Sequence, residues 1–352
     1  MTALGPGRRG RAAEAHARAG SGCGSGRPRA VAIVTSVTSA PHEPIDDLLH
    51  TLDLEELGKA EVSVEPVSVT DPELLLPSTF AEDITLFRGR SQKQPHGRVF
   101  GGQVLAQGVV ASGRTVRELD GPARRLHSIH AYFMRPGDDT RPITFSVERM
   151  RDGRSFSTRR VHAIQHGKPI LSMSASFQVP DGGLDHQDEM PEAPDPLSIP
   201  SLADVYGGID DPRARHLAGR AVELRHVEGN LYRGPGQEQV AEQLVWLRAV
   251  GELPDDPIIH EAVLAYASDY SLLEPILRRH GRSWRERGLR AASLDHAMWF
   301  HRPARADDWI LYAERSPSAQ GGRGLGIGRM FAADGTLVAS VAQEGMVRFP
   351  NA

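Results

Sequence analysis

An internal repeat constrains the fold of this chain more than any other feature of its 352-residue sequence. The segment Leu126–Pro136 aligns without a gap on Ser293–Pro303, at an offset of 167 residues. Further matches flank this segment in the same order: Phe100–Gln103 with Tyr266–Asp269, Arg154 with Arg323, Arg160 with Arg329, and Gly167 with Gly335. Ordered matches at a nearly constant offset indicate an ancestral duplication, so the chain should contain two copies of one fold.

Each copy should begin with helical sequence and continue with strands. We expect helices at Val99–Arg114 in the first copy and at about Ser268–Arg279 in the second, the latter preceded by a helical stretch at Ile258–Ala265. The segment Ile143–Val147 alternates apolar and polar residues, as a half-buried strand does. Turn residues between apolar runs predict two equivalent hairpins: Arg160–Ile164 with Ile170–Phe177, and Ile327–Ala332 with Thr336–Gln343. This pattern predicts an α+β fold in which an antiparallel sheet wraps a long central helix, twice.

The sequence outside the two copies predicts a tail, an N-terminal helix with a connecting segment, and a linker. Residues 1–44 are rich in Arg, Gly and Ala and should form a disordered tail, although an organellar transit peptide is an alternative interpretation. A helix is expected at about Ile45–Leu57, followed by a loose Val/Pro-rich stretch to about Pro77. The predicted organisation is a tail (1–44), a helix and connecting segment (45–81), a first domain (82–180), a Pro-rich linker (181–219) and a second domain (220–352).

Composition excludes several classes of function. The formal net charge of −4 gives no basic footprint for nucleic acid, and no run approaches the roughly 20 apolar residues that cross a membrane. The single cysteine, Cys23, excludes an intrachain disulfide and a multi-cysteine metal site. Scarce cysteine fits a reducing compartment, so we expect a cytoplasmic protein.

Several long motifs resemble the acyl-CoA thioesterase II family. The first half carries Phe87–Ser91, Arg98–Val104, Tyr132–Asp138, Asp152–Val161 and Ala175–Gln178. The second half carries Ala265–Asp269, Leu294–Pro303 and Val341–Gly345. The resemblance spans about residues 45–350, apart from residues 58–80. It implies a tandem double hotdog fold, hydrolysis of fatty acyl-CoA and no cofactor or metal.

The resemblance also implies three catalytic residues, which are Asp269, Ser293 and Gln343 in this chain. Some members of the family have threonine where Ser293 stands, and the hydroxyl is retained. Asp269 could take a proton from water, while Ser293 and Gln343 offer atoms that hold the water or the carbonyl oxygen. We expect Asp269 near the start of a helix, where the helix dipole favours the ionised carboxylate.

The duplication predicts a single working site. The first-copy counterparts of the three residues are Gln103, Leu126 and Ala175, none of which can act as a base. The first half should therefore serve packing and the shape of the acyl-chain site. Because all three residues belong to the second copy, the site should lie within one chain.

Other interpretations remain open at this stage. Asp295 shares a strand face with Ser293 and is the second candidate carboxylate, while His127 and His130 should be sheet-face histidines. Gly322–Gly328 is glycine-rich but does not fit a nucleotide-binding loop. A non-catalytic acyl-CoA-binding protein and an enoyl-CoA hydratase are the alternative functions. A homo-oligomer, most simply a dimer, is expected because tandem pairing leaves sheet faces and edges free.

Overall fold

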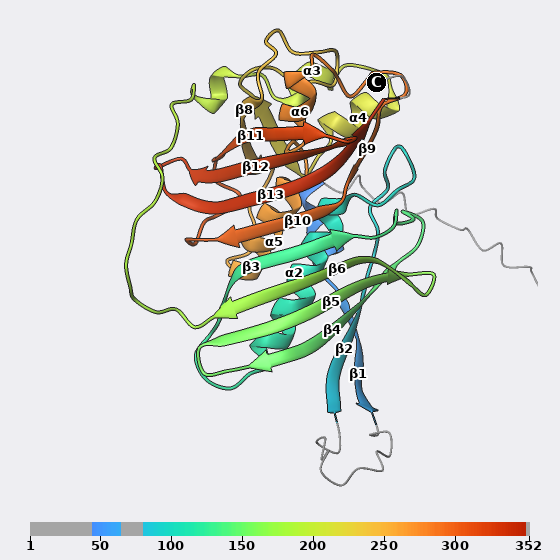
Figure 1. Cartoon of the computed structure of the whole chain (residues 1–352), viewed down its shortest axis with the longest axis vertical. Coiled ribbons are helices and arrows are strands. Elements are labelled where there is room, and N and C mark those ends of the chain that lie inside the picture. The colour runs from blue at the N-terminus through green and yellow to red at the C-terminus, as the bar shows by residue number, and fades with distance from the viewer. Residues whose placement is uncertain (1–43, 65–79, 350–352) are drawn as a thin grey trace, which may run out of the picture. The chain divides into compact units, whose positions relative to one another are not determined.

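The computed structural model describes residues 44–64 and 80–349, with long strands and few helices (Figure 1). The predicted disordered tail, residues 1–44, lies outside the described residues except for Pro44, which begins the first helix. The helices are α1 (Pro44–Leu52), α2 (Gly101–Arg117), the 3-10 helix η1 (Pro196–Ser198), α3 (Leu202–Tyr206), α4 (Pro212–Ala218), α5 (Pro257–Ser268) and α6 (Glu274–Arg279). The strands are β1 (Glu55–Val64), β2 (Phe80–Gly89), β3 (Arg125–Phe133), β4 (Ile143–Asp152), β5 (Phe156–Gln165), β6 (Lys168–Gln178), β7 (Val222–His226), β8 (Glu242–Ala249), β9 (Arg290–Ser293), β10 (Asp295–Phe300), β11 (Ile310–Gln320), β12 (Arg323–Ala332) and β13 (Leu337–Arg348).

The strands form one antiparallel sheet whose order is symmetric about its centre. The order is β1-β2-β4-β5-β6-β3-β10-β13-β12-β11-β8-β7, and the short strand β9 pairs with β13. The first six strands come from one half of the chain and the last six from the other (Figure 1). Each strand of one half has a counterpart at the same distance from the β3–β10 junction, as the duplicated sequence requires.

The register at this junction agrees with the internal repeat. His130 lies opposite Ala297 across β3 and β10, and the repeat alignment equates the same two residues. Ala131 lies opposite Met173 in the first half, as Met298 lies opposite Val341 in the second. Both predicted hairpins are confirmed by β5 with β6 and by β12 with β13. The junction is therefore a self-complementary edge pairing, like the interface of a two-fold dimer.

Helix α2 lies against one face of the first-half strands, behind them in Figure 1, and is buried along almost its entire length. Small residues allow this close packing. A Cβ on Gly108 would lie 2.9 Å from Met173 Cε, and one on Gly113 would lie 2.7 Å from Ile258 on α5. Four of its polar side chains, Gln103, Gln107, Arg114 and Arg117, share one face of the helix, and only Arg117 among them is exposed.

Three predicted elements differ from the structure. Helix α1 ends at Leu52 rather than Leu57, because β1 begins at Glu55 and pairs Glu55 and Glu56 with β2. The expected loose stretch therefore contains a strand up to Val64. The Pro-rich linker is irregular up to Asp195 but then contains η1, α3 and α4. Among the described residues, no helix is long and apolar enough to cross a membrane.

Candidate active site

The predicted helix from Ser268 to Arg279 is interrupted at the position of Asp269. Helix α5 ends at Ser268, with Asp269 as its C-cap, and α6 starts only at Glu274. Two buried side chains of β11 hold the interruption: Tyr312 OH donates to Ser268 O at 3.3 Å, and Glu314 accepts from Ser271 Oγ at 2.7 Å. Tertiary hydrogen bonds therefore replace helical ones here, which a sequence pattern cannot indicate.

The three predicted site residues meet in space. Ser293 Oγ donates to Asp269 Oδ1 at 3.1 Å. Gln343 Nε2 donates to Asp269 Oδ1 at 2.9 Å and lies 2.8 Å from Ser293 Oγ. They come from the end of α5, the end of β9 and the middle of β13, where Ser293 lies beside Gly345 across the β9–β13 pair. Asp269 and Ser293 are partly exposed, whereas Gln343 is buried, so the buried amide supports two groups that a ligand can reach.

His296 and Ser268 complete the hydrogen-bond network and were missed by the sequence analysis. His296 Nδ1 contacts Gln343 Oε1, and its Nε2 lies 2.9 Å from Ser268 Oγ. Because the amide nitrogen of Gln343 faces a carboxylate, its oxygen must face His296, which therefore carries its proton on Nδ1. Burial lowers the pKa of His296, so the ring is neutral and acts as a donor that fixes Gln343. The only signal in the sequence was strand alternation, which places His296 on the opposite face of its strand from Asp295.

The expectation that Asp269 lies near the start of its own helix was wrong. Asp269 lies at the C-terminal end of its own helix, where the dipole is unfavourable for an anion. It instead faces the N-terminus of α2 from the first half: a Cβ on Gly101 would lie 2.6 Å from Asp269 Oδ2. Helix α2 has neither a capping side chain nor an acidic residue in its first turn. Asp269 thus supplies the negative charge that this helix end lacks, and the first half contributes more than packing.

Opposing influences set the pKa of Asp269. Burial raises it, whereas the hydrogen bonds from Gln343 and Ser293 and from the backbone N–H of Gly102 lower it. Burial prevails, and the pKa lies above its ordinary value of 3.8. A raised pKa makes the carboxylate a stronger base than an exposed aspartate.

The second candidate carboxylate has a structural role. Asp295 Oδ1 accepts from the backbone N–H of Glu344 at 2.8 Å, which joins the start of β10 to β13. His127 lies on β3 and contacts Ser176, while His130 is exposed on the same strand, so both are sheet-face residues as predicted. The glycine-rich segment forms strand β12 and not a nucleotide-binding loop.

The position in the first half that corresponds to Asp269 is closed. Gln103 is fully buried, accepts from Gln92 N at 2.9 Å and donates to Gln107 Oε1 at 3.0 Å. Leu126 and Ala175, the counterparts of Ser293 and Gln343, are also buried. An amide network and apolar side chains therefore occupy the place of a second site.

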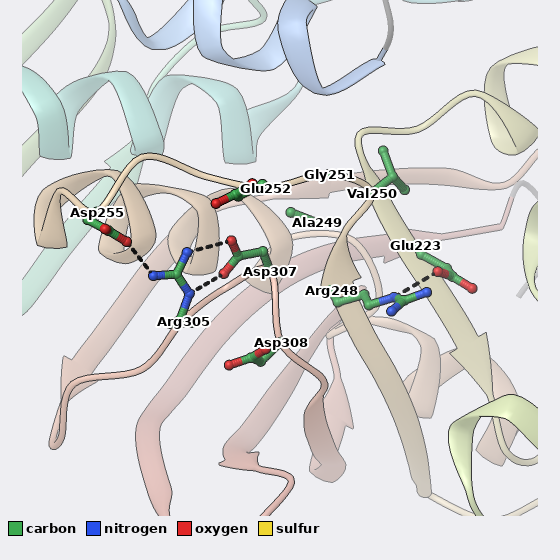
Figure 2. Close-up of a pocket in the computed structure, with 10 residues that line it drawn as sticks. All are labelled: Glu223, Arg248, Ala249, Val250, Gly251, Glu252, Asp255, Arg305, Asp307 and Asp308. Atoms are coloured by element: carbon green, nitrogen blue, oxygen red, sulfur yellow. Dashed lines mark hydrogen bonds and ion pairs between the residues drawn. The ribbon is translucent and has the colours of Figure 1, made fainter.

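A separate acidic cavity lies apart from this cluster. Its volume is about 590 Å³, and its lining residues, drawn in Figure 2, include none of the cluster around Asp269. Its two arginines pair with three of its five acids: Arg305 with Asp255 at 2.6 Å and with Asp307 at 2.8 Å, and Arg248 with Glu223 at 3.0 Å. Within residues 44–64 and 80–349, no group of three or more His, Cys, Asp and Glu side chains could hold a metal ion.

Comparison with known proteins gives consistent matches along the chain. Residues 220–346 match the family model described as "Acyl-CoA thioesterase", and residues 90–178 match "Acyl-CoA thioesterase N-terminal domain". The chain is 40% identical over 274 residues to Acyl-CoA thioesterase 2 of Haemophilus influenzae, and the alignment covers 76% of this chain and 93% of that protein.

Solved structures agree with these matches. The crystal structure of an acyl-CoA thioesterase II from Mycobacterium marinum is 40% identical, with a TM-score of 0.65, over 86% of this chain and 99% of that one. A protein of unknown function from Alicyclobacillus acidocaldarius, described as having a hot dog fold, is 18% identical with a TM-score of 0.61 over 75% of this chain and 94% of that one. The fold is therefore a hotdog fold.

Proposed function

The chain belongs to the acyl-CoA thioesterase II family, and from this premise we propose that it hydrolyses fatty acyl-CoA at the cluster of Asp269, Ser293 and Gln343. The reaction gives a free fatty acid and CoA. One observation carries the assignment: three polar side chains from separate elements hydrogen-bond to one another beside the N-terminus of α2.

Asp269 acts as the general base in this proposal. Ser293 and Gln343 hold a water molecule against the carboxylate, which removes a proton as the water oxygen attacks the thioester carbonyl. The C–O bond forms, the carbonyl oxygen becomes negative, and the C–S bond then breaks. The CoA sulfur leaves with the electron pair and takes up the proton from Asp269.

The start of α2 is suited to the negative charge that develops. The first N–H groups of a helix have no partner within the helix, and the dipole favours an anion there. The absence of a Cβ at Gly101 and Gly102 lets a ligand and Asp269 approach this backbone closely. Fixed donors of this kind stabilise an oxyanion without reorganising during the reaction.

We propose that the chain is a tandem double hotdog with one working site. The symmetric strand order and the matched register support two repeats, placed at residues 82–180 and 220–352, each with a central helix or helix pair; the segment before residue 82 adds β1 to the first. The matched ranges 90–178 and 220–346 fall inside these proposed domains. The buried amides around Gln103 support a single site per chain.

Two further predictions stay proposals. We infer a cytoplasmic location from the scarcity of cysteine. We also infer a homo-oligomer. Exposed Tyr132, Met134 and Trp299 near the β3–β10 junction, and the sheet edges formed by β1 and β7, offer surfaces for association.

The alternative functions are less consistent with the site. A hydratase needs a histidine that can exchange a proton with the ligand, but His296 is buried with both ring nitrogens engaged. A purely binding protein would not need a base with a raised pKa. Release of free CoA thiol from a fatty acyl-CoA tests the proposal, and hydration of an enoyl-CoA without thiol release would contradict it.

A further inference from the structure

A cavity of about 760 Å³ lies directly beside the Asp269 cluster and is walled in part by the predicted linker. Tyr270, which follows Asp269, and Phe100, which precedes Gly101, both line it. Their rings are stacked with centroids 4.7 Å apart, so the aromatic floor touches the site from both halves of the chain. Helices α3 and α4 add Tyr206 and Leu217 to the wall.

The cavity has a surplus of positive charge. Four arginines line it, with Asp211 as the only carboxylate: Arg213, Arg220, Arg233 and Arg285. Asp211 already caps α4 by accepting from the N–H groups of Arg213 and Ala214. Burial, with Arg220 beside it, lowers the pKa of His216 to about 4, so this lining histidine adds no charge at neutral pH.

Three of these arginines have no carboxylate partner, although Arg233 Nη2 donates to Val205 O at 2.8 Å and keeps only its other donors for an anion. Arg213, Arg233 and Arg285 are exposed, and none lies within 4 Å of a carboxylate in the part of the chain that the structure describes. The acidic cavity of Figure 2 is different, because each of its arginines pairs with an acid. Unpaired guanidinium groups are the donors that bind phosphate best in proteins.

Arg220 lies deeper and has a different environment. Its guanidinium is 4.3 Å from the centroid of the Tyr270 ring and 5.3 Å from that of Tyr232, and Nη1 donates to Tyr232 OH at 3.3 Å. Its Nε atom is buried without a hydrogen-bond partner among the described residues. This donor set is suited to a neutral carbonyl group that lies over the aromatic floor.

We propose that this cavity is the binding site for the CoA part of the substrate. This proposal rests on the proposed acyl-CoA hydrolysis at Asp269. Arg213, Arg233 and Arg285 bind the phosphates at the mouth, while Arg220 and the stacked rings bind the pantetheine arm. The arm keeps the phosphates away from the sulfur, which matches exposed arginines at the mouth and an aromatic floor beside Asp269. Residues 202–217 are then part of the substrate site and not only a connection.

Charge reversal at the mouth tests the assignment. The variant Arg213→Glu/Arg233→Glu/Arg285→Glu should raise KM for a fatty acyl-CoA by about tenfold or more, with little change in kcat. The N-acetylcysteamine thioester of the same acyl group lacks the phosphates, so its kcat/KM should stay within about twofold. Raising the salt concentration from about 0.05 M to about 0.5 M should increase KM for acyl-CoA in the unmodified protein and much less in the variant.

A matched control reverses three exposed charges elsewhere. Arg154→Glu/Arg160→Glu/Lys168→Glu changes the net charge equally but lies on β5, β6 and the turn before β5, and should leave KM unchanged. Binding of free CoA, measured by calorimetry, gives the same comparison without turnover. Equal effects of both triple variants, equal losses on both substrates, or undiminished CoA binding by the mouth variant would each overturn the cavity assignment. If the unmodified protein hydrolyses neither thioester, the proposed function itself fails.

Discussion

At the scale of single residues, Asp269 is held by donors from three separate elements, and the proposed chemistry depends on it. We expect Asp269→Asn to lower kcat by about two to four orders of magnitude, because a general base contributes that much. Ser293→Ala and Gln343→Ala should each lose less, since they remove an orienting group. Thiol release measures the rate and circular dichroism checks the fold; activity within about threefold of the unmodified protein would rule out this base.

The dependence of activity on pH follows from the same carboxylate. Asp269 must be ionised to act, so kcat/KM should fall as the pH drops through its pKa, which burial places above 3.8. Gln343 donates to the carboxylate and lowers its pKa. Gln343→Ala should therefore move the acid limb of the pH–rate profile to higher pH. A limb that stays in place, or moves to lower pH, would show that Gln343 does not stabilise the ionised form.

At the scale of elements, the approach of α2 to Asp269 requires the absence of a side chain at Gly101. A Cβ there would lie 2.6 Å from Asp269 Oδ2 and 3.0 Å from Phe133 Cε1. Gly101→Ala should therefore push the two halves of the site apart and lower kcat/KM by about tenfold to a hundredfold, because displacements of about 1 Å have effects of that size. Gly183→Ala is the control, since a Cβ there meets no atom within 4 Å. Equal activity of the two variants would contradict the proposed role of α2.

Glu314, which accepts from Ser271 in the interruption between α5 and α6, gives a prediction about the free energy of unfolding. Burial raises the pKa of Glu314 to about 8, whereas its ordinary value is 4.5. Between these values the unfolded chain loses the proton that the folded protein keeps, so this group makes folding less favourable as the pH rises from about 4.5 to about 8. Glu314→Gln removes this contribution.

Denaturant unfolding at pH 5 and pH 8 measures the effect. The free energy of unfolding should decrease with pH more steeply in the unmodified protein than in Glu314→Gln, by an amount on the order of a few kcal/mol. Comparing the two slopes separates titration from any constant loss that the substitution causes in the contacts with Ser271 and Gln243. Identical slopes would mean that Glu314 does not keep its proton in the folded protein.

At the scale of the whole molecule, the two halves pair internally as a two-fold dimer would, and all parts of the proposed site belong to one chain. We expect a dimer of whole chains in which each chain works alone. Light scattering should give a mass twice that of one chain. Mixing Asp269→Asn chains with Gln343→Ala chains under conditions that exchange subunits should restore no activity. Restored activity would show that the site is shared between chains.

The sequence by itself predicted the duplicated plan and the hairpins, and the resemblance of its motifs to a known family implied the three proposed site residues. The repeat alignment even equates His130 with Ala297, which lie opposite each other at the centre of the sheet. The repeat and the hairpins could be predicted because hydrophobic periodicity, turn residues and repeated motifs are local properties of a sequence.

Only the tertiary structure decided how Asp269 is supported. Its helix ends where it was expected to begin, because Tyr312 and Glu314 of a distant strand bind the backbone and side chain of the turn. The positive helix end that it faces belongs to α2, and the donor that orients Gln343 is His296. These contacts depend on how the two halves pack, and no local periodicity records the distance between residues that lie so far apart along the chain.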